Sequence, residues 1–322
     1  MLEIKDLTVE FKTENGVYPV LKDINLTIKE GEIMCIVGES GSGKTVTSLS
    51  IMQILPSIAE ITSGEIWLGN KNLLSLHKKD MLNIRGNEVS MIFQDPMSSL
   101  DPLFTCGDQI VETIRTHKKN VSKKEALDIA KDLLKNVGIA HPETIVDAYP
   151  HELSGGMCQR VMIAMALSTE PKLLIADEPT TALDVTVQSQ ILKLLKKIRK
   201  DFNTSIMFIT HDLGVVAELA DQVAVMYAGR IVEIGDVKSI FNNPEHPYTE
   251  GLMKSIPKLN EKKERFYSIK GSVPGITEMP KGCKFSQRCS KAFAKCFEEE
   301  PPITEIYETR KIRCWLMNQK GD

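Results

Sequence analysis

Residues 34–45 read MCIVGESGSGKT. The apolar residues 34–37 are strand-like, and residues 38–45 are a full match to the pattern G-x-x-x-x-G-K-[ST]. A helix-like stretch, TVTSLSIMQIL, follows at 45–55 and is expected to end before Pro56. Glycines let such a loop wrap closely, so that backbone N–H groups and the helix N-terminus point at phosphate oxygens. The lysine of this pattern reaches the β- and γ-phosphates, and the hydroxyl ligates Mg²⁺. We therefore predict a nucleotide-phosphate site made by Gly38, Glu39, Ser40, Gly41, Ser42, Gly43, Lys44, Thr45 and Val46.

Three further apolar runs stop abruptly at polar residues, and they are SMIF-QDP (90–96), LLIA-DE (173–178) and SIMFI-THD (205–212). In open α/β sheets, ligands bind beyond the carboxyl ends of the strands, so these ends are expected to share one site with the loop. Asp177 is expected to hold Mg²⁺ through its water shell, and Glu178 to act as general base for the attacking water. Gln94 is expected to touch Mg²⁺ and the lytic water, and His211 to donate to the γ-phosphate.

The composition is that of an ordinary globular protein and excludes several classes. Of 322 residues, 42% are hydrophobic and 26% are charged, with a formal net charge of −3. These values exclude a disordered, collagen-like or coiled-coil chain. The negative net charge also gives no excess of positive charge that would attract nucleic acid. No apolar run approaches the roughly 18 residues of a membrane-spanning helix. The first residues, MLEIKDLTVEF, carry charges where a signal peptide would be apolar, so the chain is expected to stay in the cytoplasm.

Strand-like and helix-like runs alternate along most of the chain, which predicts an α/β fold with a parallel sheet and a helical insertion. A helix is expected over 123–138, closing at Gly138, and a hairpin over 222–235, turning near Ala228-Gly229. We divide the chain into a core (1–96 and 166–241), a helical subdomain (97–165) and a C-terminal extension (242–322).

The sequence LSGGM at 153–157 resembles the LSGGQ signature of ABC-type ATPases, with Met157 in place of the glutamine. The phosphate loop, Gln94, Asp177-Glu178, ALD (182–184) and His211 occur in the order and spacing of an ABC cassette. The resemblance implies a P-loop ABC-type nucleotide-binding domain, in which an antiparallel β subdomain and a helical subdomain accompany the α/β core.

The same resemblance implies further site residues. Ser154, Gly155 and Gly156 would open a helix whose N-terminus attracts the γ-phosphate of an ATP held by a second cassette. Asp184 joins the nucleotide site, and Phe11 is the position expected to stack on adenine, with Tyr18 as the second candidate. Because the chain carries one phosphate loop and one signature, it should need a partner cassette.

The segment NPEHPYT (243–249) resembles the start of the tail in ATP-binding subunits of dipeptide and oligopeptide importers, a type of subunit that nickel importers share. This implies an ATP-hydrolysing subunit at the cytoplasmic face of the cell membrane. Its partners would be two integral membrane permease subunits, an external substrate-binding protein and a second, different cassette. The alternatives are import of nickel or another small solute, a non-transport iron–sulfur ABC ATPase acting on ribosomes or DNA, and a regulatory module that holds ATP without hydrolysing it.

Four cysteines of the tail, Cys283, Cys289, Cys296 and Cys314, are spaced C-x5-C-x6-C-x17-C. In a reducing compartment four nearby thiols favour a metal over disulfides, although this spacing does not identify the metal. The resemblance to importer tails implies a [4Fe–4S] cluster, with Zn²⁺ and free thiols as alternatives. Cys35, Cys106 and Cys158 are interpreted as packing cysteines.

Overall fold

A computed structural model describes residues 1–181, 183–256, 267–307 and 310–318. The chain divides into two compact units. The first unit contains Met1–Ile28, Ile33–Leu74 and Thr210–Asp322, and the second contains Lys29–Glu32 and Ser75–Ile209. The first therefore carries the phosphate loop and the tail, and the second carries the helical segment with the LSGGM sequence.

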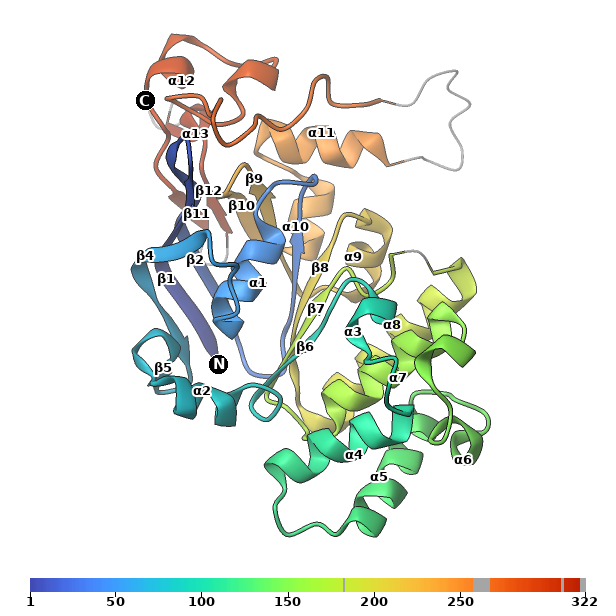
Figure 1. Cartoon of the computed structure of the whole chain (residues 1–322). Coiled ribbons are helices and arrows are strands. Elements are labelled where there is room, and N and C mark those ends of the chain that lie inside the picture. The colour runs from blue at the N-terminus through green and yellow to red at the C-terminus, as the bar shows by residue number, and fades with distance from the viewer. Residues whose placement is uncertain (182, 257–266, 308–309, 319–322) are drawn as a thin grey trace. The chain divides into compact units, whose positions relative to one another are not determined.

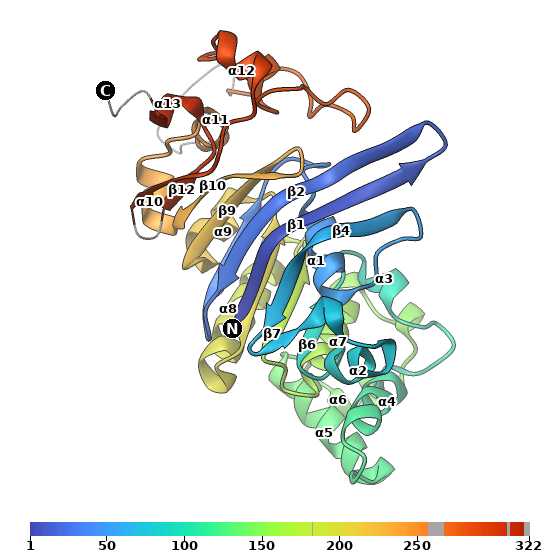
Figure 2. The ribbon, with the colours of Figure 1, turned by 90° about the vertical axis from the view of Figure 1, so that its left-hand side faces the viewer.

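The first unit begins with an antiparallel sheet in the order β2-β1-β4-β5, and Figure 2 shows β1, β2 and β4 side by side. The strands are β1 (Leu2–Thr13), β2 (Gly16–Ile28), β4 (Ala59–Leu68) and β5 (Lys71–Asn72). Leu2 pairs with Ile28 on one side and Leu68 on the other, and all three are buried. This sheet agrees with the antiparallel β subdomain that the resemblance implied.

A second set of strands in the first unit is ordered β11-β12-β10-β9-β3. They are β3 (Ile33–Val37), β9 (Gln222–Tyr227), β10 (Arg230–Asp236), β11 (Thr304–Tyr307) and β12 (Arg310–Ile312). β3 is parallel to β9, whereas the other neighbouring pairs are antiparallel. The predicted hairpin is confirmed, because Ala228 and Gly229 take φ values of 46° and 72° between β9 and β10. β11 and β12 come from the tail and extend the sheet beyond β10.

The helices of the first unit are α1 (Lys44–Met52), α9 (Leu213–Leu219), α10 (Val237–Asn242), α11 (Pro247–Ser255), α12 (Ala294–Glu298) and α13 (Trp315–Asn318). α1 starts at Lys44, within the phosphate-loop pattern and one residue before the helix expected at 45–55, but it ends at Met52, earlier than expected. The reason is local: Gln53 adopts a left-handed conformation with φ of 50°, and its N–H donates to the carbonyl of Ser50 at 3.1 Å. This closes the last turn before Pro56 is reached.

The second unit contains three parallel strands, β6 (Val89–Ile92), β7 (Leu173–Asp177) and β8 (Ser205–Thr210), in the order β8-β7-β6. Every residue of these strands is buried, which is typical of parallel sheets covered on both faces. The predicted parallel α/β arrangement is therefore present in this unit.

Helices make up most of the second unit, and Figure 1 shows α4, α5 and α7 grouped together. They are α2 (Lys78–Ile84), α3 (Pro96–Ser99), α4 (Cys106–His117), α5 (Lys123–Asn136), α6 (Pro142–Ile145), α7 (Gly155–Leu167) and α8 (Val185–Phe202). α5 begins with a capping box between Ser122 and Glu125, and Gly138 follows its end with φ of +83°, as expected. Within the described ranges, no helix has both the length and the apolar character needed to cross a bilayer.

Candidate functional site

The phosphate loop leaves β3 and closes on α1 within the first unit. A side chain at Gly38 would not fit, because its Cβ would lie 2.2 Å from the carbonyl oxygen of Met226. Gly43 takes φ of +102° at the N-cap of α1, and its Cβ would lie 2.6 Å from a methyl group of Leu21. The backbone path of the loop therefore requires these two glycines.

Lys44 is only 6% exposed, and its ammonium group donates to the carbonyl oxygens of Gly38 at 2.8 Å and Glu39 at 3.1 Å. The Ser42 hydroxyl is fully buried and has no hydrogen-bond partner among the described residues. Thr45 is exposed in the first turn of α1, where backbone N–H groups are free of intrahelical partners. The loop thus gathers a lysine, hydroxyls and N–H groups, which is the chemistry that binds phosphate.

Phe11 and Tyr18, the two candidates for adenine stacking, are directly opposite each other on β1 and β2. Opposite residues of an antiparallel pair share one face of the sheet, so both rings lie on the same side. His211, also in the first unit, is exposed and precedes Asp212, the N-cap of α9.

In the second unit, β7 ends at the buried Asp177, and the next residue, Glu178, has a left-handed backbone with φ of 47°. This conformation is uncommon for a residue with a side chain and costs of order 1 kcal/mol. The Glu178 carboxylate accepts hydrogen bonds from the Gln94 amide at 3.3 Å and from the Thr181 hydroxyl at 3.0 Å. The structure therefore brings Gln94 and Glu178 together, and it adds Thr181, which we did not predict.

The LSGGM sequence starts α7. Ser154 is the N-cap, and its hydroxyl oxygen accepts the N–H of Met157 at 3.4 Å. A side chain at Gly155 would meet no atom within 4 Å, so the first turn of this helix is open. Asp184 caps α8 in the same way, accepting the N–H groups of Thr186 at 2.9 Å and Val187 at 3.0 Å. Ser154 and Asp184 therefore each cap a helix, in addition to any role in nucleotide binding.

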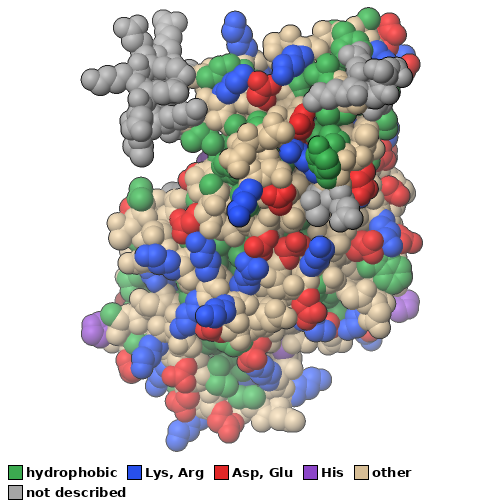
Figure 3. All heavy atoms as spheres, turned by 180° about the vertical axis from the view of Figure 1, so that it is seen from behind, with side chains coloured by type: hydrophobic (Ala, Val, Ile, Leu, Met, Phe, Trp, Pro, Cys, Tyr) green, Lys and Arg blue, Asp and Glu red, His purple; other side chains and the backbone are tan. Residues whose placement is uncertain are grey.

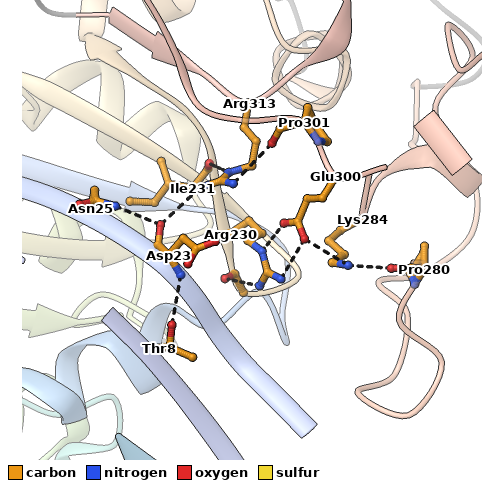
Figure 4. Close-up of polar contacts among 11 residues, drawn as sticks. Thr8, Asp23, Asn25, Arg230, Ile231, Pro280, Lys284, Glu300, Pro301 and Arg313 are labelled. Carbon is orange, nitrogen blue, oxygen red and sulfur yellow. Dashed lines mark hydrogen bonds and ion pairs between the residues drawn. The ribbon is translucent and has the colours of Figure 1, made fainter. Parts of the chain in front are cut away.

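The tail is a folded part of the first unit, held by buried arginines (Figure 4). Arg230 pairs with Glu300, whose carboxylate also lies 3.5 Å from the ammonium group of Lys284. Arg313 donates to the carbonyl oxygens of Ile231 and Asp23, both at 3.4 Å. These contacts tie the last part of the chain to β2 and β10.

The four tail cysteines are half-buried or buried, and none of them forms a disulfide with another described residue. The N–H of Cys283 donates to the carbonyl of Cys296 at 2.8 Å. Burial raises the pKa of Cys283 to about 12, and nearby charge on Cys314, Cys296 and Cys289 raises it as well. Nevertheless, no three or more His, Cys, Asp or Glu side chains of the described residues are arranged to hold a metal ion. The thiols are thus near enough to affect one another without forming a coordination sphere.

Cys35, Cys106 and Cys158 are buried, as the packing interpretation expects. The contacts that the tail makes with the phosphate loop escaped prediction. Tyr248 and Arg288 both bind Glu39, and these residues are 209 and 249 positions away from it in the chain. No local pattern could have indicated such a pairing.

Comparison with known proteins identifies two families along the chain. The family "ABC transporter" matches residues 21–181, and "Oligopeptide/dipeptide transporter, C-terminal region" matches residues 232–296. The chain is 51% identical to "Oligopeptide transport ATP-binding protein OppD" of Bacillus subtilis (strain 168), over 99% of this chain and 89% of that protein. It is 48% identical to "Dipeptide transport ATP-binding protein DppD" of Lactococcus lactis subsp. cremoris (strain MG1363), over 100% of this chain and 92% of that protein.

A solved structure with a similar fold is the dimeric, post-hydrolysis state of the ATP-binding cassette MJ0796 bound to ADP and Pi. It aligns with a TM-score of 0.68 and 29% identity, covering 74% of this chain and 99% of that chain. The resemblance inferred from the motifs is therefore confirmed, both for the cassette and for the tail. The chain belongs to the ABC transporter family of ATP-binding proteins and carries the C-terminal region found in oligopeptide and dipeptide transporters.

Proposed function

We propose that this ABC ATPase energises the uptake of dipeptides or oligopeptides through separate permease subunits. The observation that carries the proposal is similarity over the whole chain, tail included, to proteins named for oligopeptide and dipeptide transport. The absence of a membrane-crossing helix in the described ranges is consistent with peripheral binding at the cytoplasmic face of the membrane.

The alternatives have less support. The relatives described above are named for peptides, and none of them for nickel. An ATPase that acts on ribosomes or DNA should present a basic surface. The net charge is −3, and on the face in Figure 3 basic and acidic side chains are interspersed instead of gathered by sign. A module that holds ATP without hydrolysing it would have no use for Glu178 and His211.

In the proposed reaction, the residues act by position and charge. The N–H groups of the phosphate loop (38–46) and the Lys44 ammonium bind the phosphates. Thr45, Gln94 and Asp177 supply hydroxyl, amide and carboxylate oxygens, the donors that Mg²⁺ prefers, and bound Mg²⁺ neutralises phosphate charge. Glu178 accepts a proton from the attacking water, and the Gln94 and Thr181 hydrogen bonds orient its carboxylate. His211 donates to the γ-phosphate.

The signature residues Ser154, Gly155 and Gly156 serve a second cassette. The open first turn of α7 offers N–H groups and the positive end of a helix dipole to the γ-phosphate of an ATP bound by the partner. We infer that the partner is a different chain, giving a heterodimer. Phe11 stacks on adenine, and Asp184 completes the nucleotide site.

The permease is proposed to bind a groove of the second unit. This groove has a volume of about 930 Å³ and is lined by the C-terminal end of α3, the loop after it, α4, Lys123 of α5 and Met165 of α7. Phe104 lines it and is 54% exposed, next to Leu103, which is 79% exposed. Large apolar side chains exposed at a concave surface are typical of sites that bind another protein.

We infer that the tail thiols hold a metal centre, with a [4Fe–4S] cluster favoured and Zn²⁺ as the alternative. The chemistry of the donor set suits either one, because both are bound by four cysteine thiolates, although no three of these side chains are already arranged around a common point in the described residues. The centre would act as a structural cross-link between the segments around Cys283, Cys289, Cys296 and Cys314. A visible spectrum and metal analysis of anaerobically purified protein test this. A broad absorption near the violet with about four irons per chain is expected, whereas colourless, zinc-loaded protein would overturn the cluster.

Peptide uptake in cells tests the proposed function. Cells lacking this chain should fail to accumulate a labelled dipeptide or oligopeptide, and the wild-type chain should restore uptake while Lys44→Ala should not. Labelled nickel is the second arm of the experiment. Restoration of nickel uptake without any effect on peptide uptake would contradict the proposal.

A further inference from the structure

The tail contacts the phosphate loop at one residue, Glu39. The backbone N–H of Glu39 donates to the hydroxyl oxygen of Tyr248 at 3.0 Å. The Glu39 carboxylate oxygens lie 3.0 and 3.1 Å from the Nη1 atom of Arg288. Tyr248 belongs to α11 and Arg288 directly precedes Cys289, so two separate segments of the tail meet at the same loop residue.

The Tyr248 contact fixes the peptide bond between Gly38 and Glu39. The N–H of this peptide is held by Tyr248, and its carbonyl, that of Gly38, accepts from the Lys44 ammonium at 2.8 Å. A peptide group held at both ends cannot rotate without losing a hydrogen bond. Tyr248 therefore supports the carbonyl that holds Lys44 in place.

The side chains of Tyr248 and Arg288 are buried and held by other contacts within the first unit. Tyr248 is fully buried, and its ring packs on Tyr227 and Phe285 with centroids 4.7 and 5.3 Å apart. The Arg288 side chain is 7% exposed and donates to the carbonyl oxygens of Lys270 at 2.9 Å and Gly271 at 3.1 Å. Neither residue needs to be ordered when a nucleotide binds, so neither contact carries an entropic cost at that step.

The Arg288 contact also neutralises the negative charge of Glu39 in the phosphate loop. Glu39 occupies the second position of a loop that binds a polyanion, and its side chain is 30% exposed. A carboxylate near a triphosphate repels it, and a guanidinium bound to that carboxylate cancels the repulsion. Arg288 is therefore placed to cancel the repulsion between the phosphates and Glu39, which is a residue of the phosphate loop.

We propose that Tyr248 and Arg288 are positioning residues for nucleotide binding, so that the tail forms part of the phosphate loop. Tyr248 fixes the peptide that holds Lys44, and Arg288 neutralises Glu39. The proposal rests on the phosphate-binding role of the loop given under the proposed function.

The test is a titration of full-length protein with a fluorescent ATP analogue. Arg288→Gln should raise the Kd about tenfold, and Arg288→Lys should recover part of the loss because it keeps the charge. The double variant Glu39→Gln/Arg288→Gln should return to within about threefold of wild type, because no carboxylate is left to repel the phosphates.

Kinetics and controls separate positioning from general damage. In ATP hydrolysis, Arg288→Gln should raise KM and leave kcat at saturating ATP unchanged, because Arg288 contributes to the binding of ATP and not to the chemical step. Lys281→Gln, an exposed tail lysine, makes the same charge change and should bind ATP like wild type. Wild-type affinity in Arg288→Gln, or a double variant as weak as Arg288→Gln, would overturn the proposal. Wild-type binding by Lys44→Ala would instead overturn the role of the loop.

Discussion

The hydroxyl oxygen of Tyr248 accepts the backbone N–H of Glu39 at 3.0 Å, so a residue of the tail completes a hydrogen bond of the phosphate loop. Tyr248→Phe keeps the buried ring and removes only this acceptor. The unpaired N–H should cost about 1–3 kcal/mol of stability and raise the Kd for ATP several-fold. Thermal unfolding and nucleotide titration measure both effects. Tyr307→Phe, at a tyrosine that is 69% exposed, is the matched control, and equal affinity in the two variants would contradict the role of the hydroxyl.

The buried His246 makes stability depend on pH. Its Nδ1 accepts the N–H of Tyr248 at 3.0 Å, and burial lowers its pKa from 6.5 to about 3. The folded state therefore keeps this ring neutral, while the unfolded chain binds a proton below pH 6.5. The contribution of His246 is fully present above that pH and is lost progressively as the pH falls towards 3, by about 1.4 kcal/mol per unit.

His246→Asn isolates this contribution, because asparagine can also cap α11 but does not titrate. We expect the free energy of unfolding of wild type to fall by about 2 kcal/mol more than that of the variant between pH 6.5 and 5. Denaturant titrations at the two pH values measure it. Parallel pH profiles would show that His246 is not the group responsible.

Metal binding by the tail should be strongly pH-dependent. Burial raises the pKa of Cys283 to about 12 and that of Cys314 to about 11, so in metal-free protein these thiols are protonated near neutral pH. Each thiol that binds a metal must release its proton. The affinity for Zn²⁺, measured by competition with a chromophoric chelator under reducing conditions, should rise at least tenfold per pH unit between pH 6 and 8.

Cys283→Ser and Cys296→Ser should each weaken Zn²⁺ binding strongly. Cys106→Ala removes a buried thiol of the second unit and is the control, expected to bind Zn²⁺ like wild type. Equal affinity in all three variants would place the metal outside the tail, and an affinity that does not change with pH would show that protonated thiols are not its ligands.

The sequence predicted the local features of the fold well. The loop at 38–45, the turn at Ala228-Gly229 and the helix α5 closed near Gly138 follow from patterns within a few residues, such as glycine spacing and helical periodicity. The predicted end of α1 was wrong. The helix ends early because Gln53 adopts a left-handed backbone conformation, which has no clear sequence signature when the residue is not glycine.

The features that could not be predicted depend on distant parts of the chain. Glu39 meets Tyr248 and Arg288 only because the tail folds within the unit that contains the loop. Glu178 has a strained backbone that only the surrounding structure can maintain. Thr181 is closer in sequence, yet a threonine after a carboxylate is too common to be recognised as its hydrogen-bond donor.

Paired measurements of ATP binding and steady-state hydrolysis on Glu178→Gln test whether this chain hydrolyses ATP with Glu178 as the general base. The control is Glu143→Gln, at an exposed glutamate of α6. We expect Glu178→Gln to bind ATP like wild type and to hydrolyse it about 10²–10⁴-fold more slowly, while Glu143→Gln behaves like wild type in both assays. Turnover by Glu178→Gln at the wild-type rate would exclude Glu178 as the general base.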